Sequence, residues 1–122
     1  MPVVDAHKAV GGAVIALNLV VGLWGLWAWR QQALASPVLA QLLALSHTIV
    51  LLEGALGLYL LAGGYRSAQG LHYVYGAIPA GAVLFGYSAR TPDARRNLLQ
   101  FAVIALAIAV LTGRAFMTGA PA

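Results

Sequence analysis

Four long apolar segments dominate the sequence and constrain what it can fold into. They cover roughly residues 6 to 29, 38 to 62, 69 to 89 and 97 to 118. A helix needs about 20 apolar residues to cross the hydrocarbon core of a bilayer, which is about 30 Å thick. Only 8% of the 122 residues are charged, against roughly 25% in soluble proteins. We therefore expect a single transmembrane domain over residues 1 to 122 with four membrane-spanning helices.

Short connections with helix-ending and helix-starting residues separate the four segments. The "SP" at 36 to 37 and the "TPD" at 91 to 93 place a capping hydroxyl beside a proline at a helix start. The "GG" at 63 to 64 ends a helix, and Ser67 can cap the next one. Short connections force consecutive helices to run antiparallel, so the sequence predicts an all-α, integral membrane, up-down-up-down four-helix bundle with the first helix diagonal to the third.

The charged residues indicate an orientation in the membrane. We call the end of the bundle that holds both termini side A and the opposite end side B. Side B carries Arg30, Arg90, Arg95 and Arg96, and side A carries Lys8, Arg66 and Arg114. Cytoplasmic segments are enriched in Lys and Arg, so we expect side B in the cytoplasm and both termini on the outer side of a plasma (inner) membrane.

Composition also excludes some classes of function. The net charge of +4 comes from basic residues scattered singly at helix ends, which membrane topology explains, so no nucleic-acid partner is expected. The chain has no cysteine, which excludes disulfides, thiolate metal sites and covalently attached haem. We find no nucleophile elbow and no phosphate-binding glycine loop, so the sequence assigns no enzymatic reaction.

Polar and small residues within the spans recur every three or four positions, which places them on single helix faces. Polar groups in membrane spans usually face the bundle interior. The predicted inward stripes are His7, Gly11, Val14, Asn18, Gly22 and Gly25 on the first helix, Ser46, Val50, Glu53 and Gly57 on the second, His72, Gly76, Pro79, Val83 and Gly86 on the third, and Gln100, Val103, Ala107, Val110 and Arg114 on the fourth.

The polar residues of these stripes fall at similar depths. A rise of 1.5 Å per residue puts His7, His72 and Arg114 each about 5 Å inside side A, with Glu53 about 8 Å deeper. We expect them to form one cluster, in which Glu53 and Arg114 could simply pair with each other because an isolated charge in a membrane is costly. His47 lies about 20 Å from side A and is expected to bond a backbone carbonyl of a neighbouring helix.

Two histidines at equal depth on diagonal helices suit the two axial positions of a haem iron. In this interpretation His7 and His72 bind the metal, while Gly11 and Gly76, one turn along, leave room for the macrocycle. Arg114, together with Lys8 or Arg66, would neutralise the propionates at side A, and Glu53 would tune the site or exchange protons.

The segments "HKAVG" (7 to 11) and "GLHYVYG" (70 to 76), together with the four-span layout, resemble those of the small four-helix membrane b-type cytochromes. The resemblance implies a b-type haem between His7 and His72 and electron transfer with a redox partner or a quinone at side A. Three histidines allow one haem with two histidine ligands, and Met117 is an alternative axial ligand.

Two further hypotheses remain open. One is a haem-free pocket around Glu53 that handles a quinone, another small molecule or protons, with Asn18 and His47 continuing a polar line toward side B. A metal held by His7, His72 and Glu53 is a variant of the haem site. The other hypothesis is an accessory structural subunit whose glycine-rich faces pack in a homo-oligomer or a larger membrane complex.

Overall fold

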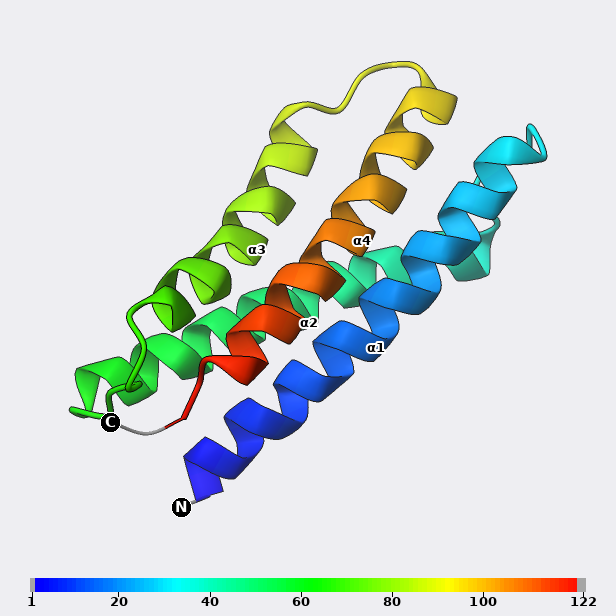
Figure 1. Ribbon diagram of the computed structural model, residues 1–122. Coiled ribbons are helices and arrows are strands. Elements are labelled where there is room, and N and C mark those ends of the chain that lie inside the picture. The colour runs from blue at the N-terminus through cyan, green and yellow to red at the C-terminus, as the bar shows by residue number, and fades with distance from the viewer. Residues whose placement is uncertain (1, 121–122) are drawn as a thin grey trace.

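The computed structural model describes residues 2 to 120 as four α-helices joined by short connections (Figure 1). Helix α1 spans Pro2–Arg30, α2 Pro37–Ala62, α3 Leu71–Ser88 and α4 Ala94–Met117. Consecutive helices run antiparallel, each contacts the next, and α4 returns to contact α1 over the most extensive of the interfaces. The all-α fold expected from the sequence is confirmed, and α1 faces α3 across a diagonal.

The helix ends follow the sequence signals with two exceptions, at the starts of α3 and α4. Ser36 caps α2 by accepting a hydrogen bond from the Leu39 backbone N–H at 3.2 Å. After α2, Gly64 has a φ of +90°, a left-handed conformation that glycine adopts without steric cost. At α4 the capping residue is Asp93, rather than Thr91, and its carboxylate accepts hydrogen bonds from two first-turn amides. The carboxylate thereby lies at the positive end of the helix dipole.

The C-terminal segment is tied to the connection between α2 and α3 at side A. The Ala68 N–H donates to the Ala120 carbonyl oxygen at 2.8 Å, and the Ser67 hydroxyl donates to the Thr118 carbonyl oxygen at 2.6 Å. The sequence predicts Ser67 as the cap of α3, but the residue at the cap position is Gly70, so no side chain caps this helix. The hydroxyl instead fixes the chain that follows α4.

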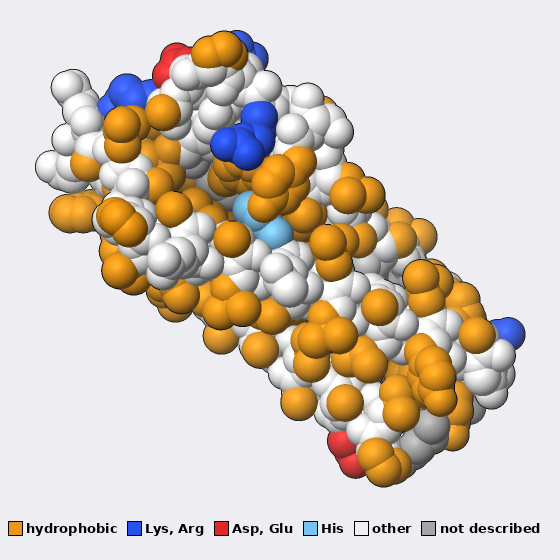
Figure 2. All heavy atoms as spheres, turned by 180° about the vertical axis from the view of Figure 1, so that it is seen from behind, with side chains coloured by type: hydrophobic (Ala, Val, Ile, Leu, Met, Phe, Trp, Pro, Cys, Tyr) orange, Lys and Arg blue, Asp and Glu red, His pale blue; other side chains and the backbone are white. Residues whose placement is uncertain are grey.

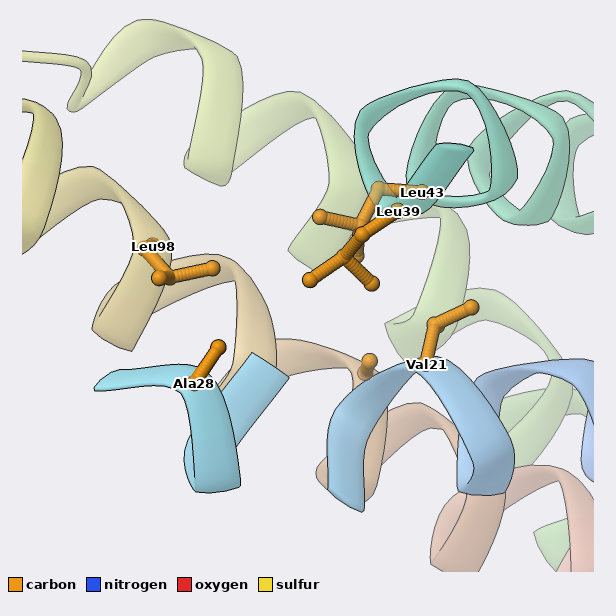
Figure 3. Close-up of a cluster of buried hydrophobic side chains, with 6 residues drawn as sticks. Val21, Ala28, Leu39, Leu43 and Leu98 are labelled. Atoms are coloured by element: carbon orange, nitrogen blue, oxygen red, sulfur yellow. The ribbon is translucent and has the colours of Figure 1, made fainter. Parts of the chain in front are cut away.

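Buried apolar side chains form a core near side B. Figure 3 shows side chains from α1, α2 and α4 converging there, namely Val21, Ala28, Leu39, Leu43 and Leu98. Glycine lets α1 and α4 approach closely beside this core, because a Cβ on Gly22 would lie 2.7 Å from Cγ of Leu106. A second cluster takes one side chain from each helix: Val14, Val50, Val83 and Ile108. These two clusters leave the side A end of the bundle for the polar residues.

The buried face of α4 is not the predicted one. Val103 and Val110 are 52% and 67% exposed, whereas Ala102 is fully buried. The predicted stripe depends on its polar ends, Gln100 and Arg114, but every residue from Phe101 to Leu111 is apolar, so periodicity does not select a face there. Small side chains form the buried face because they let α4 approach α1 closely. At this contact a Cβ on Gly25 would lie 3.1 Å from the Cβ of Ala102. The rotation carries Arg114 to the exposed surface.

Within residues 2 to 120, three helices are long and apolar enough to cross a membrane: α1, α2 and α4. Helix α3 was expected to be a fourth span but is not among them. Its 18 residues give a length of about 27 Å, slightly less than the hydrocarbon core. Polar aromatic residues near its ends, His72, Tyr73, Tyr75 and Tyr87, also lower its mean hydropathy.

Candidate functional site

A cavity of about 910 Å³ lies toward side A and is lined by residues of all four helices. His7, Glu53 and His72 line this cavity together with a mainly apolar wall. Val14 and Val50 of the second buried cluster line its inner part. Two cations, Lys8 and Arg66, also line the cavity. The structure therefore brings together five of the six predicted site residues, because Gly11 and Gly76 also line the cavity and only Arg114 does not.

His7 and Glu53 form a pair between α1 and α2. Nδ1 of His7 contacts Oε1 of Glu53, and the two side chains are only 22% and 15% exposed. Glycine makes room for both groups, since a Cβ on Gly57 would lie 3.3 Å from Cε1 of His7 and one on Gly11 would lie 3.3 Å from Oε2 of Glu53. A carboxylate accepts hydrogen bonds, so the proton of neutral His7 lies on Nδ1 and the lone pair on Nε2.

His72 is held by α4. Its Nδ1 donates a hydrogen bond to the Ala115 carbonyl oxygen at 2.8 Å. Because a carbonyl can only accept, neutral His72 also carries its lone pair on Nε2. A Cβ on Gly119 would lie 3.1 Å from Cε1 of His72, so the absence of a side chain at this position leaves room for the ring.

The two imidazole rings stand 6.2 Å apart between their centroids, with their planes at 89°. Among residues 2 to 120, neither Nε2 atom takes part in a hydrogen bond within the protein. Two histidines from diagonal helices thus leave their Nε2 atoms free while their Nδ1 atoms contact a carboxylate and a carbonyl. This is the arrangement in which proteins hold metal-binding histidines, because the second nitrogen sets the tautomer and the ring orientation.

The remaining predicted site residues are placed differently. Arg114 does not line the cavity and its guanidinium carbon lies 5.9 Å from the centre of the Tyr75 ring. It also makes no pair with Glu53, which pairs with His7 instead. The space beside Gly11 is taken by the Glu53 carboxylate, whereas no atom lies within 4 Å of a Cβ on Gly76. Both predicted clearance glycines line the cavity, but only Gly76 has free space beside it.

His47 is remote from this cavity and lines a second one toward side B. Its Nδ1 lies 2.8 Å from the Tyr87 hydroxyl of α3, rather than beside a backbone carbonyl as the sequence had suggested. The bond to a neighbouring helix agrees with the prediction, but the bonding group is a side-chain hydroxyl instead of a backbone carbonyl.

Three functional groups could not be recognised from the sequence alone. The Ala115 carbonyl has no side-chain signal, and Gly57 and Gly119 resemble ordinary packing glycines. Within the described range, 2 to 120, no group of three or more His, Asp or Glu residues could hold a metal ion. A metal with His7, His72 and Glu53 as joint ligands is therefore not supported, because Glu53 contacts the imidazole itself.

Comparison of the chain with models of protein families, with curated proteins and with solved structures found no match.

Proposed function

We propose that this chain is an integral membrane protein that holds one b-type haem between His7 and His72 and transfers single electrons. The observation that carries the proposal is the geometry of the two imidazoles. The membrane environment, the space beside the rings and the charges at the rim support it.

A membrane environment accounts for the surface of the molecule. Figure 2 shows Lys, Arg, Asp and Glu side chains gathered toward the two ends of the molecule, with hydrophobic side chains covering much of the length between them. Large apolar residues are exposed along all four helices, among them Leu23, Leu58, Leu84 and Val110. An apolar surface of this extent is unfavourable in water and suits lipid. We place side B in the cytoplasm because four arginines lie there.

The spacing of the two rings fits one metal ion between them. An imidazole nitrogen binds a metal at about 2 Å and lies about 1 Å from its ring centre, so two axial imidazoles have centres about 6 Å apart. The observed separation is 6.2 Å. Both Nε2 lone pairs are free, as axial ligation requires, because each Nδ1 is held by a protein oxygen.

The cavity offers space and charge for the haem macrocycle and its carboxylates. Its volume of about 910 Å³ lies in the upper part of the range for ligand pockets, roughly 300 to 1,000 Å³. Gly76 lines the open part, where it would leave room for a flat ring. Lys8 and Arg66 line the cavity and would pair with the carboxylates of the group, a role for which the sequence had suggested them together with Arg114.

When bound, haem supplies reversible one-electron chemistry, and the residues of the chain set its conditions. His7 and His72 would hold the iron. Glu53 orients His7 and increases the basicity of its ring by accepting a hydrogen bond from Nδ1–H, and the Ala115 carbonyl does the same for His72. The apolar wall excludes water, which makes these interactions stronger than they would be in solvent.

An absorption spectrum tests the proposal. The protein is purified in detergent after expression with a haem precursor, and its spectrum is recorded before and after reduction with dithionite. We expect a strong Soret band that shifts on reduction, with separate α and β bands typical of a low-spin haem. A spectrum of tryptophan and tyrosine alone, even after haemin is added, would exclude the haem.

A haem-free pocket for a quinone head group is the second candidate function. Oε2 of Glu53 is buried and has no hydrogen-bond partner in the structure. Buried polar atoms are normally paired, so this oxygen is available to a ligand that donates a hydrogen bond. A quinol hydroxyl is such a donor. The spectrum separates the two candidates because only the haem protein is pigmented.

A further inference from the structure

A second cavity, of about 390 Å³, lies toward side B between α2, α3, α4 and the connection that follows α1. Small side chains create much of the space, with Ala40 and Ala44 on α2 and Ala94 on α4 among its lining residues. Its volume lies within the range of small-molecule pockets. The cavity is separate from the His7–His72 site, because the two share no lining residue.

Three aromatic side chains from three helices meet at this cavity. The ring centre of His47 lies 5.2 Å from that of Tyr87 and 5.1 Å from that of Phe101, and Tyr87 and Phe101 are 5.5 Å apart. All three residues line the cavity. They form an aromatic wall against which a flat ring can stack.

The same wall contains a polar atom without a partner. His47 is only 6% exposed, and its Nε2 is buried with no hydrogen bond. When the Tyr87 hydroxyl donates to Nδ1, which lies 2.8 Å away, the proton of neutral His47 is on Nε2, which becomes a donor. An unsatisfied buried donor costs free energy, so a ligand that offers an acceptor here regains a hydrogen bond.

Arg90 adds a second group of donors among the lining residues. The other strongly polar lining residue, Asn97, is already engaged with Thr91 through both its amide nitrogen and its amide oxygen. The cavity therefore offers two sources of free N–H groups, an imidazole and a guanidinium, within an otherwise apolar and aromatic wall.

We infer that this side B cavity binds the head group of a quinone. A para-quinone is flat, apolar on its faces and carries two carbonyl acceptors on opposite sides, which match the aromatic wall and the two donors. The apolar tail of the ligand would run along the exposed apolar surface toward lipid. The site does not depend on haem at the other end of the molecule.

Photolabelling tests the inference. The full chain in detergent is incubated with an azido-substituted short-chain quinone, illuminated and digested, and the labelled peptides are identified by mass spectrometry. We expect label within residues 34 to 47 or 87 to 101, and we expect excess decylubiquinone to prevent it. Label that is absent, confined to the His7–His72 cavity or not prevented by decylubiquinone would overturn the inference. Protection by phosphatidylglycerol but not by decylubiquinone would assign the cavity to a lipid instead.

Two variants with one matched control sharpen the result. Ala44→Trp fills the cavity and is expected to abolish protectable labelling, whereas Leu45→Trp places the same side chain at a neighbouring exposed position outside the cavity and is expected to label normally. His47→Phe keeps a flat ring but removes the donor, so decylubiquinone should compete about three- to tenfold more weakly, the effect of one hydrogen bond. Equal labelling and protection of the Ala44→Trp and Leu45→Trp proteins would contradict the site.

Discussion

The imidazole rings of His7 and His72, from the first and third helices, stand 6.2 Å apart with perpendicular planes. Nδ1 of His7 contacts Glu53 on α2, and Nδ1 of His72 bonds the Ala115 carbonyl on α4. All four helices thus contribute to one pair of rings whose Nε2 atoms remain free. Such an arrangement of partly buried polar groups among apolar helices is expected where a site has a function.

Replacement of either axial histidine should remove the pigment. His7→Ala and His72→Ala each delete one of the two lone pairs, and we expect either protein to lose the low-spin reduced spectrum. His47→Ala is the control, because His47 lines the other cavity, and its spectrum should match that of the wild type. Equal loss of pigment in all three variants would show that the ligand assignment is wrong.

Glu53→Gln should change the properties of the haem rather than abolish its binding. The amide keeps the size of the side chain but is a weaker acceptor than the carboxylate that contacts Nδ1 of His7. A less basic ligand stabilises the oxidised iron less, so we expect a higher reduction potential and about 10- to 100-fold weaker haem binding. Potentiometric titration measures the first effect and haem titration the second.

Leu52→Gln is the control for that variant, since it introduces the same side chain at an exposed neighbouring position outside the cavity. It should leave both values unchanged. If Glu53→Gln behaves like Leu52→Gln, then the carboxylate does not act on His7.

The glycines that seat the two rings should not tolerate a methyl group. A Cβ on Gly119 would lie 3.1 Å from Cε1 of His72, and one on Gly57 would lie 3.3 Å from Cε1 of His7. We expect Gly119→Ala and Gly57→Ala to broaden or shift the α band because each displaces an axial ring. Gly12→Ala, where no atom lies within 4 Å of the new Cβ, should leave the spectrum unchanged.

The close contact between α1 and α4 should depend on Gly22. Its Cβ would lie 2.7 Å from Cγ of Leu106 and 3.1 Å from the Leu106 backbone nitrogen, so relief requires the helix itself to shift. We expect Gly22→Ala to lower the free energy of unfolding by about 1 to 3 kcal/mol, measured by denaturant titration in detergent. Gly81→Ala meets no atom within 4 Å, and a comparable loss there would argue against this explanation.

Cysteine labelling in intact cells should reveal the topology. The chain has no cysteine, so Gln32→Cys, Gln69→Cys and Pro92→Cys each introduce a single thiol in a different connection. With side B in the cytoplasm, an impermeant maleimide should label position 69 and spare positions 32 and 92. If positions 69 and 92 react alike, α3 does not cross the membrane, and the three helices that are long and apolar enough to do so are α1, α2 and α4.

The sequence by itself determined the helical class, the number of helices and most of their ends, because apolar run length, prolines and glycines act locally. It also indicated which faces of α1, α2 and α3 turn inward, since polar or small residues mark them at helical spacing. The shared depth of His7 and His72 follows from counting residues along helices that alternate in direction.

Only the tertiary structure decided the rotation of α4, the pairing of Glu53 with His7 and the exposure of Arg114. From Phe101 to Leu111 helix α4 is apolar all round, so its buried face is chosen by how closely small side chains let it approach α1, and this depends on both helices at once. The Ala115 carbonyl and the space beside Gly57 and Gly119 are likewise invisible in a sequence. They arise where backbones from different helices come within contact distance, and local residue patterns carry no record of that distance.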